Sequence, residues 1–121
     1  DHCILLSDFS HSGDEVFVET KNNFLINMSK NKSQLQNKPT GELVGITKIS
    51  QRLLNCMTTH AEEKFEHTLF YDYETGALVD SSKDIDIDCL LVEDLIWAEI
   101  DDPDHLKRAI NLIYPMIKSN E

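Results

Sequence analysis

The sequence predicts a mixed α/β or α+β domain in which helices pack against a β-sheet. Short apolar runs in the first half of the chain have the length and composition of β-strands. Two later stretches carry apolar side chains at helical spacing. The order of strands, helix, strand and helix favours a sheet covered by helices. A chain of 121 residues is long enough for one core, so we expect residues 1–121 to form a single domain.

The first half of the chain contains three short runs that are typical of strands. Residues 3–6 are apolar and are followed by the polar pair Ser7 and Asp8. Residues 16–18 and 24–28 are joined by an Asn-rich connection, and connections of this length and composition suit a hairpin. We therefore expect one strand and then a two-stranded hairpin.

Residues 41–49 predict a further strand, which leads directly into a helix. Gly45 interrupts this strand, and a glycine inside a strand often marks a close approach of a ligand or of another backbone. Ser50 is a suitable N-cap for a helix that extends to about His67. The apolar stripe of that helix consists of Leu53, Leu54, Met57, Ala61 and Phe65.

The second half of the chain predicts a buried terminal strand. Residues 70–78 give only a weak helical signal, residues 80–88 read as an acidic loop, and residues 90–92 are apolar. Residues 95–100 are apolar at every position except Glu99, as expected when both faces of a strand are covered.

A helix is expected directly after this strand. Asp102 is a good N-cap and Pro103 a good first helical residue. Pro115 is expected to end or kink the helix. Asp101 would then lie at the carboxyl end of a strand, where open α/β sheets bind their ligands. The apolar face of the helix consists of Leu106, Ala109, Ile110 and Ile113.

The overall charge and the cysteines limit the classes of partner. A formal net charge of -11 disfavours nucleic-acid polymers and anionic membranes, and no apolar run approaches the ~18 residues of a membrane span. Cys3, Cys56 and Cys89 are odd in number and widely spaced, which favours reduced thiols and a cytoplasmic location. The chain begins with Asp1 before an apolar run, so we expect a fragment or a processed chain.

Three positions suggest a site for a cation and a phosphate. Glu99 and Asp101 alternate with Trp97 along one strand face, and Mg²⁺ is commonly bound by one or two carboxylates plus substrate phosphates. The alternative is that Asp101 only helps to cap the last helix. Lys30 could neutralise a phosphate, although a lone lysine before a polar loop is usually solvated.

Other candidate motifs have weaker support. Glu42, beside Gly45, could hold an amine or hydroxyl of a ligand, or it could be an edge charge that opposes aggregation. His60 and His67 lie seven positions apart, which is a poor chelate for zinc, so we expect a solvated helix face. Residues 84–88 resemble the start of a calcium loop but lack its glycine and its final glutamate. A glycine-rich phosphate loop and a G-x-S-x-G elbow are both missing from the sequence.

Several short motifs occur in the order found in one enzyme superfamily. They are N-M-S-K at residues 27–30, G-E-L-V-G-I-T-K-I-S at residues 41–50, and W-A-E-I-D at residues 97–101, followed by residues 104–109. With the opening residues 1–8, this set resembles the second half of the sugar-phosphate nucleotidyltransferases. The similarity is greatest to the cytidylyltransferases for phosphocholine and 2-aminoethylphosphonate.

The resemblance implies the C-terminal half of a Rossmann-like α/β nucleotidyltransferase fold, with a mixed sheet and packed helices. Such enzymes use Mg²⁺ to join an NTP, here CTP, to a phosphorylated small molecule, and they release pyrophosphate. By motif match, Asp101 would bind the metal, Lys30 would be the catalytic contact to the acceptor phosphate, and Glu42 and Gly45 would line the acceptor pocket. The family's N-terminal glycine-rich loop and earlier metal-binding Asp are missing, so we expect the isolated chain to be inactive.

Two other interpretations remain open. The chain could be a non-catalytic binding or assembly module derived from that fold, because a partial sheet would expose an edge through which a homodimer could form. It could also be an unrelated α/β domain in which Asp101 belongs only to a helix cap. In the second case Lys30, Glu42 and Asp101 would lie on different faces of the molecule.

Overall fold

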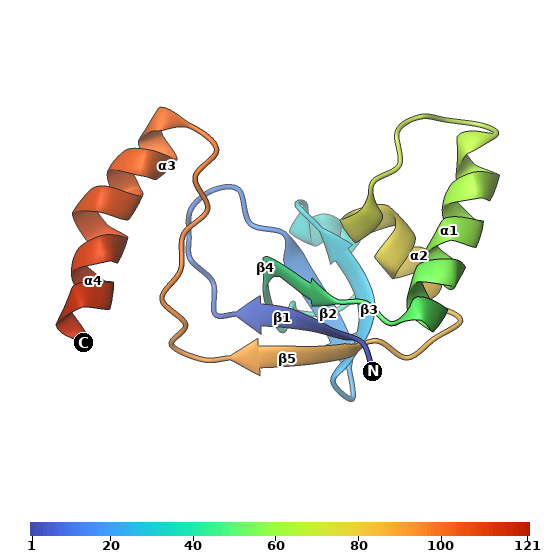
Figure 1. Cartoon of the computed structure of the whole chain (residues 1–121), viewed down its shortest axis with the longest axis horizontal. Helices are drawn as coiled ribbons and strands as arrows, with labels where there is room; N and C mark the ends of the chain where they lie inside the picture. Colours follow the sequence, from blue (N-terminus) through green and yellow to red (C-terminus); the bar gives the residue numbers. More distant parts are fainter.

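The computed structural model describes all 121 residues, and its centre is a closed β-barrel in which β1 pairs with β4, followed in order by β2, β3 and β5 (Figure 1). β5 returns to β1 and pairs with it in parallel, whereas the other neighbouring pairs are antiparallel. The strands are β1 (Cys3–Ser7), β2 (Phe17–Lys21), β3 (Phe24–Ser29), β4 (Gly41–Lys48) and β5 (Asp88–Val92).

The strands arise largely where the apolar runs predict them. β1 and β4 coincide with the runs at residues 3–6 and 41–49, and β5 includes residues 90–92. β2 and β3 form the expected hairpin, and its tip places Asn22 and Asn23 at positive φ, which asparagine tolerates better than most residues.

The expectation of a Rossmann-like half-fold with helices packed on an open mixed sheet is wrong, because the sheet closes on itself. The strands are short, and register shifts interrupt the β1–β4 and β2–β3 pairings. Such irregularities increase the local twist and bend the strands, which favours closure. A single pairing between Phe24 of β3 and Asp88 of β5 joins the two ends of the sheet.

The predicted terminal strand at residues 95–100 is also wrong, because this segment has no regular secondary structure and pairs with no strand. β1 already has β4 on one side and β5 on the other, so the barrel offers the segment no central position. A side-chain hydrogen bond replaces strand pairing: the indole Nε1 of Trp97 donates to Ser7 Oγ at 2.8 Å.

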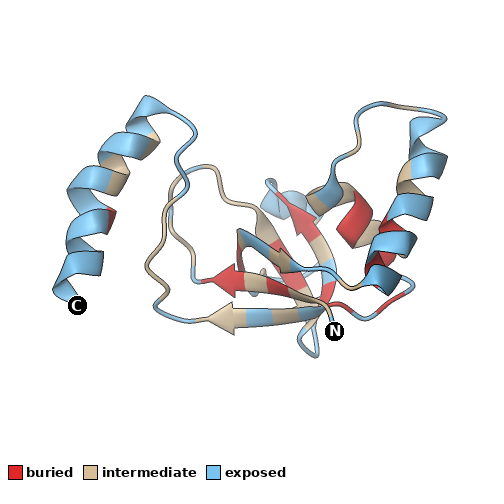
Figure 2. Ribbon diagram, viewed as in Figure 1, coloured by how far each residue is buried: buried red, intermediate tan, exposed pale blue.

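The helices flank the barrel on two sides (Figure 1). On one side lies α1 (Gln51–Phe65), whose N-cap Ser50 accepts a hydrogen bond from the backbone of Leu53. A π-helical segment (Tyr73–Leu78) continues into α2 (Val79–Ser81) beside it, and a 3-10 turn (Lys32–Gln34) follows β3. Buried side chains concentrate in the barrel and on the facing sides of α1 and α2 (Figure 2). This core consists of Ile4, Leu6, Val18, Leu25, Met28, Leu43, Leu53, Met57, Ala77, Leu78 and Ile87.

The other side carries α3 (Pro103–Arg108), a π-helical segment (Ala109–Ile113) and α4 (Tyr114–Ser119), which follow one another directly. Pro115 does not end the helix. It lies in the first turn of α4, directly after the π-helical segment, where a missing N–H is tolerated. Ile113 is the one buried residue of these helices. None of the helices combines the length and apolar character that crossing a membrane would require.

Candidate cation and phosphate site

Three carboxylates and one ammonium group meet beside the barrel. Asp14, Glu99 and Asp101 each place one carboxylate oxygen within 4.8 Å of a carboxylate oxygen of the other two. Lys30 Nζ lies 2.7 Å from Asp14 Oδ1. The structure therefore brings Lys30 and Asp101, which are 71 positions apart in the sequence, to one place.

Separate segments position these four side chains. Asp14 follows Gly13, whose φ of +90° suits glycine, in the loop that leads to β2. Lys30 comes directly after the last residue of β3. Glu99 and Asp101 lie on the irregular segment that Trp97 anchors to β1, just before Asp102 caps α3.

The charges of the cluster perturb one another. The hydrogen bond to Asp14 raises the pKa of Lys30, with further support from the negative charges of Glu99 and Asp101. Partial burial, and then the neighbouring carboxylates of Asp101 and Asp14, raise the pKa of Glu99. The second contribution, from the two neighbouring carboxylates, is a repulsion between negative charges that a cation would relieve.

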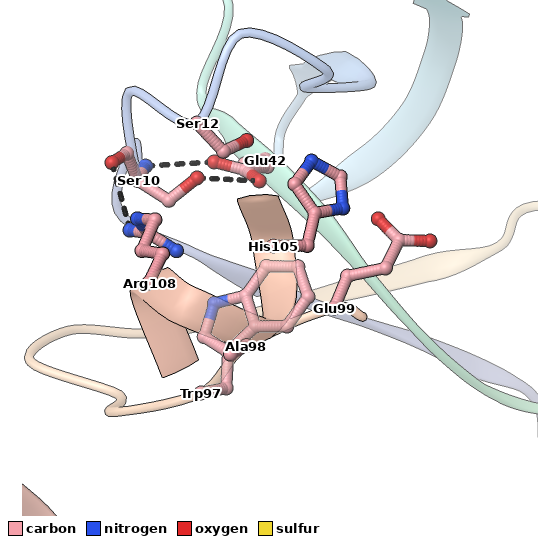
Figure 3. Close-up of a pocket in the computed structure, with 8 residues that line it drawn as sticks. All are labelled: Ser10, Ser12, Glu42, Trp97, Ala98, Glu99, His105 and Arg108. Carbon is pink, nitrogen blue, oxygen red and sulfur yellow. Dashed lines mark hydrogen bonds between the residues drawn. The ribbon is translucent and has the colours of Figure 1, made fainter. Parts of the chain in front are cut away.

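Glu42 lies close to this cluster, but its carboxylate is already occupied. The side chain is only 3% exposed, and its oxygens accept hydrogen bonds from Ser10 N at 2.7 Å and from Ser10 Oγ at 2.9 Å (Figure 3). Both contacts hold the loop that follows β1, the same loop that carries Asp14. Glu42 therefore shapes the site through this loop and presents little free acceptor capacity to a ligand.

Gly45 lies on the rim of a small pocket that Asp14, Glu42 and Glu99 also line. Its φ is +86°, and a Cβ built at this position would meet nothing within 4 Å. The glycine is thus required by the backbone conformation of β4, and the space beside it is open. No neighbouring atom lies close to the position of that Cβ, and the open space leaves room for a ligand.

A second small pocket adjoins Glu42 and carries the basic side chains of this region (Figure 3). Arg108 donates a hydrogen bond to the backbone oxygen of Ser10 at 3.2 Å, and His105 lies on the neighbouring turn of α3. The ring of Trp97 forms one wall. Aromatic and cationic groups beside a carboxylate cluster are suited to a small, charged, partly apolar molecule.

The donor set of the cluster fits a hard divalent cation. All three groups offer carboxylate oxygens, the ligands that Mg²⁺ prefers, and two of the three side chains are exposed enough to leave positions for water or phosphate. Asp14, Glu99 and Asp101 would hold the ion. The interpretation in which Asp101 only belongs to a helix cap is not required, because Asp102 supplies the cap.

The sequence alone predicts Lys30, Glu42, Gly45 and Asp101 as candidate site residues, and it does not single out Asp14, which the structure places beside Lys30 and Asp101. Asp14 lies in a turn-rich segment with no periodic pattern, so only the tertiary structure reveals that it pairs with Lys30. A search with protein-family models finds no family that matches this chain.

Replacing Glu99 with Gln is expected to stabilise the protein at pH 7 in the presence of EDTA. The raised pKa means that the folded state binds a proton at Glu99 more tightly than the unfolded chain does. Ionisation of Glu99 thus opposes folding above its folded pKa and has no effect well below the ordinary value. We expect a gain of about 0.5 kcal/mol at pH 7 that disappears towards pH 4, since exposed like charges interact weakly.

Urea denaturation at several pH values measures this effect. Glu93→Gln is the control, because Glu93 is an exposed carboxylate in the same connection but outside the cluster. A Glu99→Gln variant that is less stable than wild type at pH 7 would contradict the proposed crowding of negative charge.

Proposed function

We propose that this chain forms the acceptor-binding portion of a Mg²⁺-dependent nucleotidyltransferase. The reaction moves a nucleotidyl group from an NTP, with CTP favoured, to a phosphorylated small molecule. An acceptor phosphate oxygen forms the bond to the α-phosphorus while the bond to pyrophosphate breaks. The barrel is not the fold of the enzymes that the motifs resemble, so the proposal rests on the residues and their geometry.

The proposal rests on one observation: the ammonium group of Lys30 lies beside the carboxylates of Asp14, Glu99 and Asp101. Nucleotidyl transfer depends mainly on positioning and on neutralising phosphate charge, and a lysine beside a carboxylate cluster supplies the protein groups for both. A bound Mg²⁺ would neutralise negative charge on the phosphates. The Lys30 ammonium would contact the acceptor phosphate, and Gly45 would leave room for it.

The ion pair between Lys30 and Asp14 suggests that the two ligands bind cooperatively. In the structure Lys30 occupies one oxygen of Asp14. An acceptor phosphate that attracts Lys30 would free that oxygen for the cation, so each ligand would favour binding of the other. The missing glycine-rich loop means that the nucleotide side of the reaction would come from outside this chain. Binding is therefore a more direct test than turnover.

Isothermal titration calorimetry with Mg²⁺, with and without phosphocholine, 2-aminoethylphosphonate or glucose 1-phosphate, tests the proposal. We expect Asp101→Asn to weaken Mg²⁺ binding at least tenfold, equivalent to about 1.4 kcal/mol. Lys30→Gln should bind Mg²⁺ at least as tightly as wild type, because a competing cation is removed. It should lose the enhancement by the phosphorylated ligand.

Matched controls are available close to the cluster residues in the sequence. Asp104 is an exposed acid outside the carboxylate cluster, and Lys32 is a cation two positions after Lys30, so Asp104→Asn and Lys32→Gln should behave as wild type. Mg²⁺ affinity of Asp101→Asn within twofold of wild type would refute the metal site. Binding of Mg²⁺ without any coupling to the three phosphorylated ligands would refute the acceptor site.

The second candidate function is a non-catalytic assembly module. Barrel closure removes the free sheet edge on which the sequence-based idea of a homodimer depended. A different observation favours assembly: the C-terminal helices expose Leu106, Ile110, Leu112, Met116 and Ile117. Light scattering over a range of concentrations tests the assembly function, since a strict monomer at high concentration argues against self-assembly.

We also infer a cytoplasmic location. The support is that Cys3, Cys56 and Cys89 are all unpaired thiols, which is typical of reducing compartments.

A further inference from the structure

A second cluster of metal-ligating side chains lies where α1 meets the loop that follows α2. His60 Nε2 is 2.8 Å from Asp84 Oδ2, and the Cys56 thiol donates to the same oxygen at 3.9 Å. One donor atom from each of the three residues lies within 4.8 Å of the others. The cluster belongs to the side of the barrel covered by α1, opposite the C-terminal helices (Figure 1). It shares no residue with the cation and phosphate site.

The fold holds the two helical donors in place. Cys56 and His60 are four positions apart on α1, so their side chains lie one turn apart on the same helix face. Leu53 and Met57, which are buried in the core, fix the rotation of α1 against the barrel. This rotation directs Cys56 and His60 towards the loop that carries Asp84.

The third donor is held just as firmly. Asp84 N donates to Ser81 O at 3.0 Å, and Ile85 N donates to the same oxygen at 2.9 Å, so the loop forms a tight turn after α2. Ile85 and Ile87, both buried, anchor the chain on the far side of this turn. The core therefore fixes the backbone positions of the three donor residues without a bound ion.

The donor set differs in kind from the all-oxygen cluster at Lys30. A thiolate, an imidazole and a carboxylate together are typical of Zn²⁺, and they disfavour Mg²⁺, which selects oxygen ligands. Zn²⁺ bonds of about 2.0–2.3 Å in a tetrahedron place neighbouring donors roughly 3–4 Å apart, close to the separations found here. Asp84 is exposed and Cys56 and His60 are half-buried, so solvent can reach the open side of the cluster.

We propose that Cys56, His60 and Asp84 form a zinc site that keeps a fourth coordination position for water. On binding, the Cys56 thiol would lose its proton to solvent, and His60 would adopt the neutral tautomer with its proton on Nδ1, so that Nε2 can donate its lone pair. Asp84 would exchange its two hydrogen bonds for one metal bond. The pairing of His60 with Asp84 could not be deduced from the sequence, because the two residues are 24 positions apart.

Cobalt(II) substitution and zinc competition titration on the full 121-residue chain test this site. Co²⁺ bound by Cys56 should give a sulfur-to-metal charge-transfer band and the intense visible absorption of a tetrahedral complex. We expect a zinc dissociation constant in the micromolar range or tighter. We expect Cys56→Ala to abolish the charge-transfer band, and Cys56→Ala, His60→Ala and Asp84→Asn each to weaken zinc binding at least tenfold. Millimolar Mg²⁺ should not displace the Co²⁺.

Matched controls separate this site from the other cysteines and histidines. Cys3→Ser and His67→Asn remove a thiol and an α1-flanking imidazole outside the cluster, and both should bind zinc within twofold of wild type. Circular dichroism in EDTA establishes that each variant folds, and Cys56→Ser replaces Cys56→Ala if the latter does not. Zinc binding weaker than about 100 µM, or a charge-transfer band that persists without Cys56, overturns the proposal.

Discussion

Leu6→Ala is expected to lower the free energy of unfolding by about 3–4 kcal/mol, the range for a buried leucine whose loss leaves a cavity. Leu6 is fully buried in the core, on the strand that pairs with both β4 and β5. Denaturation with urea or guanidinium measures the change. The midpoint should fall, and the slope should stay close to that of wild type.

The neighbouring residue makes this a test of the architecture. In a barrel, alternate side chains of a strand point inward, so Leu6 is buried whereas Leu5 is only partly buried. Leu5→Ala should therefore cost less than half as much. Leu90→Ala, which truncates a 54% exposed leucine on the adjacent strand, should change stability by no more than about 0.5 kcal/mol. Equal large losses for Leu5 and Leu6 would indicate a sheet covered on both faces and would contradict the barrel.

The same strand shows why the sequence predicts the elements better than their arrangement. Residues 3–6 are continuously apolar, and this pattern is typical of a strand covered on both faces. The partly covered outer position of Leu5 in a barrel produces the same pattern. Local patterns therefore predict β1, β4, the hairpin and α1 correctly. Closure depends on one long-range pairing, Phe24 with Asp88, that no local pattern encodes.

The prediction of a strand at residues 95–100 is wrong for a related reason. Leu95, Ile96 and Trp97 line a groove together with Ile113 of the C-terminal helices, and Ile100 is exposed. Apolarity reports burial, and it does not report whether a neighbouring strand edge is available for pairing. The expected place of Asp101 at the carboxyl end of a strand in an open sheet is therefore also wrong. Asp101 still lies directly before the helix start, because that position depends on Asp102 and Pro103 and not on strand pairing.

The candidate site could be predicted only in part. Lys30, Glu42, Gly45 and Asp101 stand out because each lies at the end of an apolar run or interrupts one. Asp14 has no such local signal. Of the two sequence-based interpretations of Glu42, the exposed edge charge is wrong, because the residue is buried and accepts hydrogen bonds from Ser10, and the contact to a ligand stays a prediction. Burial of a charge is a tertiary property, set here by the loop that folds over it.

Glu42→Ala is expected to reduce both stability and cation binding. The substitution removes the acceptor for two hydrogen bonds from Ser10, and hydrogen bonds to a charged group are worth about 1.5–3 kcal/mol. Part of this loss in the free energy of unfolding is offset, because the variant has no carboxylate to desolvate on folding. We therefore expect a net loss of about 2 kcal/mol. The released loop carries Asp14, so Mg²⁺ affinity should fall about fivefold or more without any loss of a metal ligand.

Glu19 provides the control that separates these two effects. It is also a buried glutamate that holds a loop, since it accepts hydrogen bonds from Gln36 N and from the side chain of Asn37, but that loop carries none of the three carboxylates of the cluster. Glu19→Ala should lower stability by a similar amount and leave Mg²⁺ affinity within twofold of wild type. If both variants lower the affinity equally, general destabilisation and not the position of Asp14 governs the site. If only Glu42→Ala does so, the buried carboxylate acts by holding Asp14 in place, since its own oxygens are both engaged by Ser10.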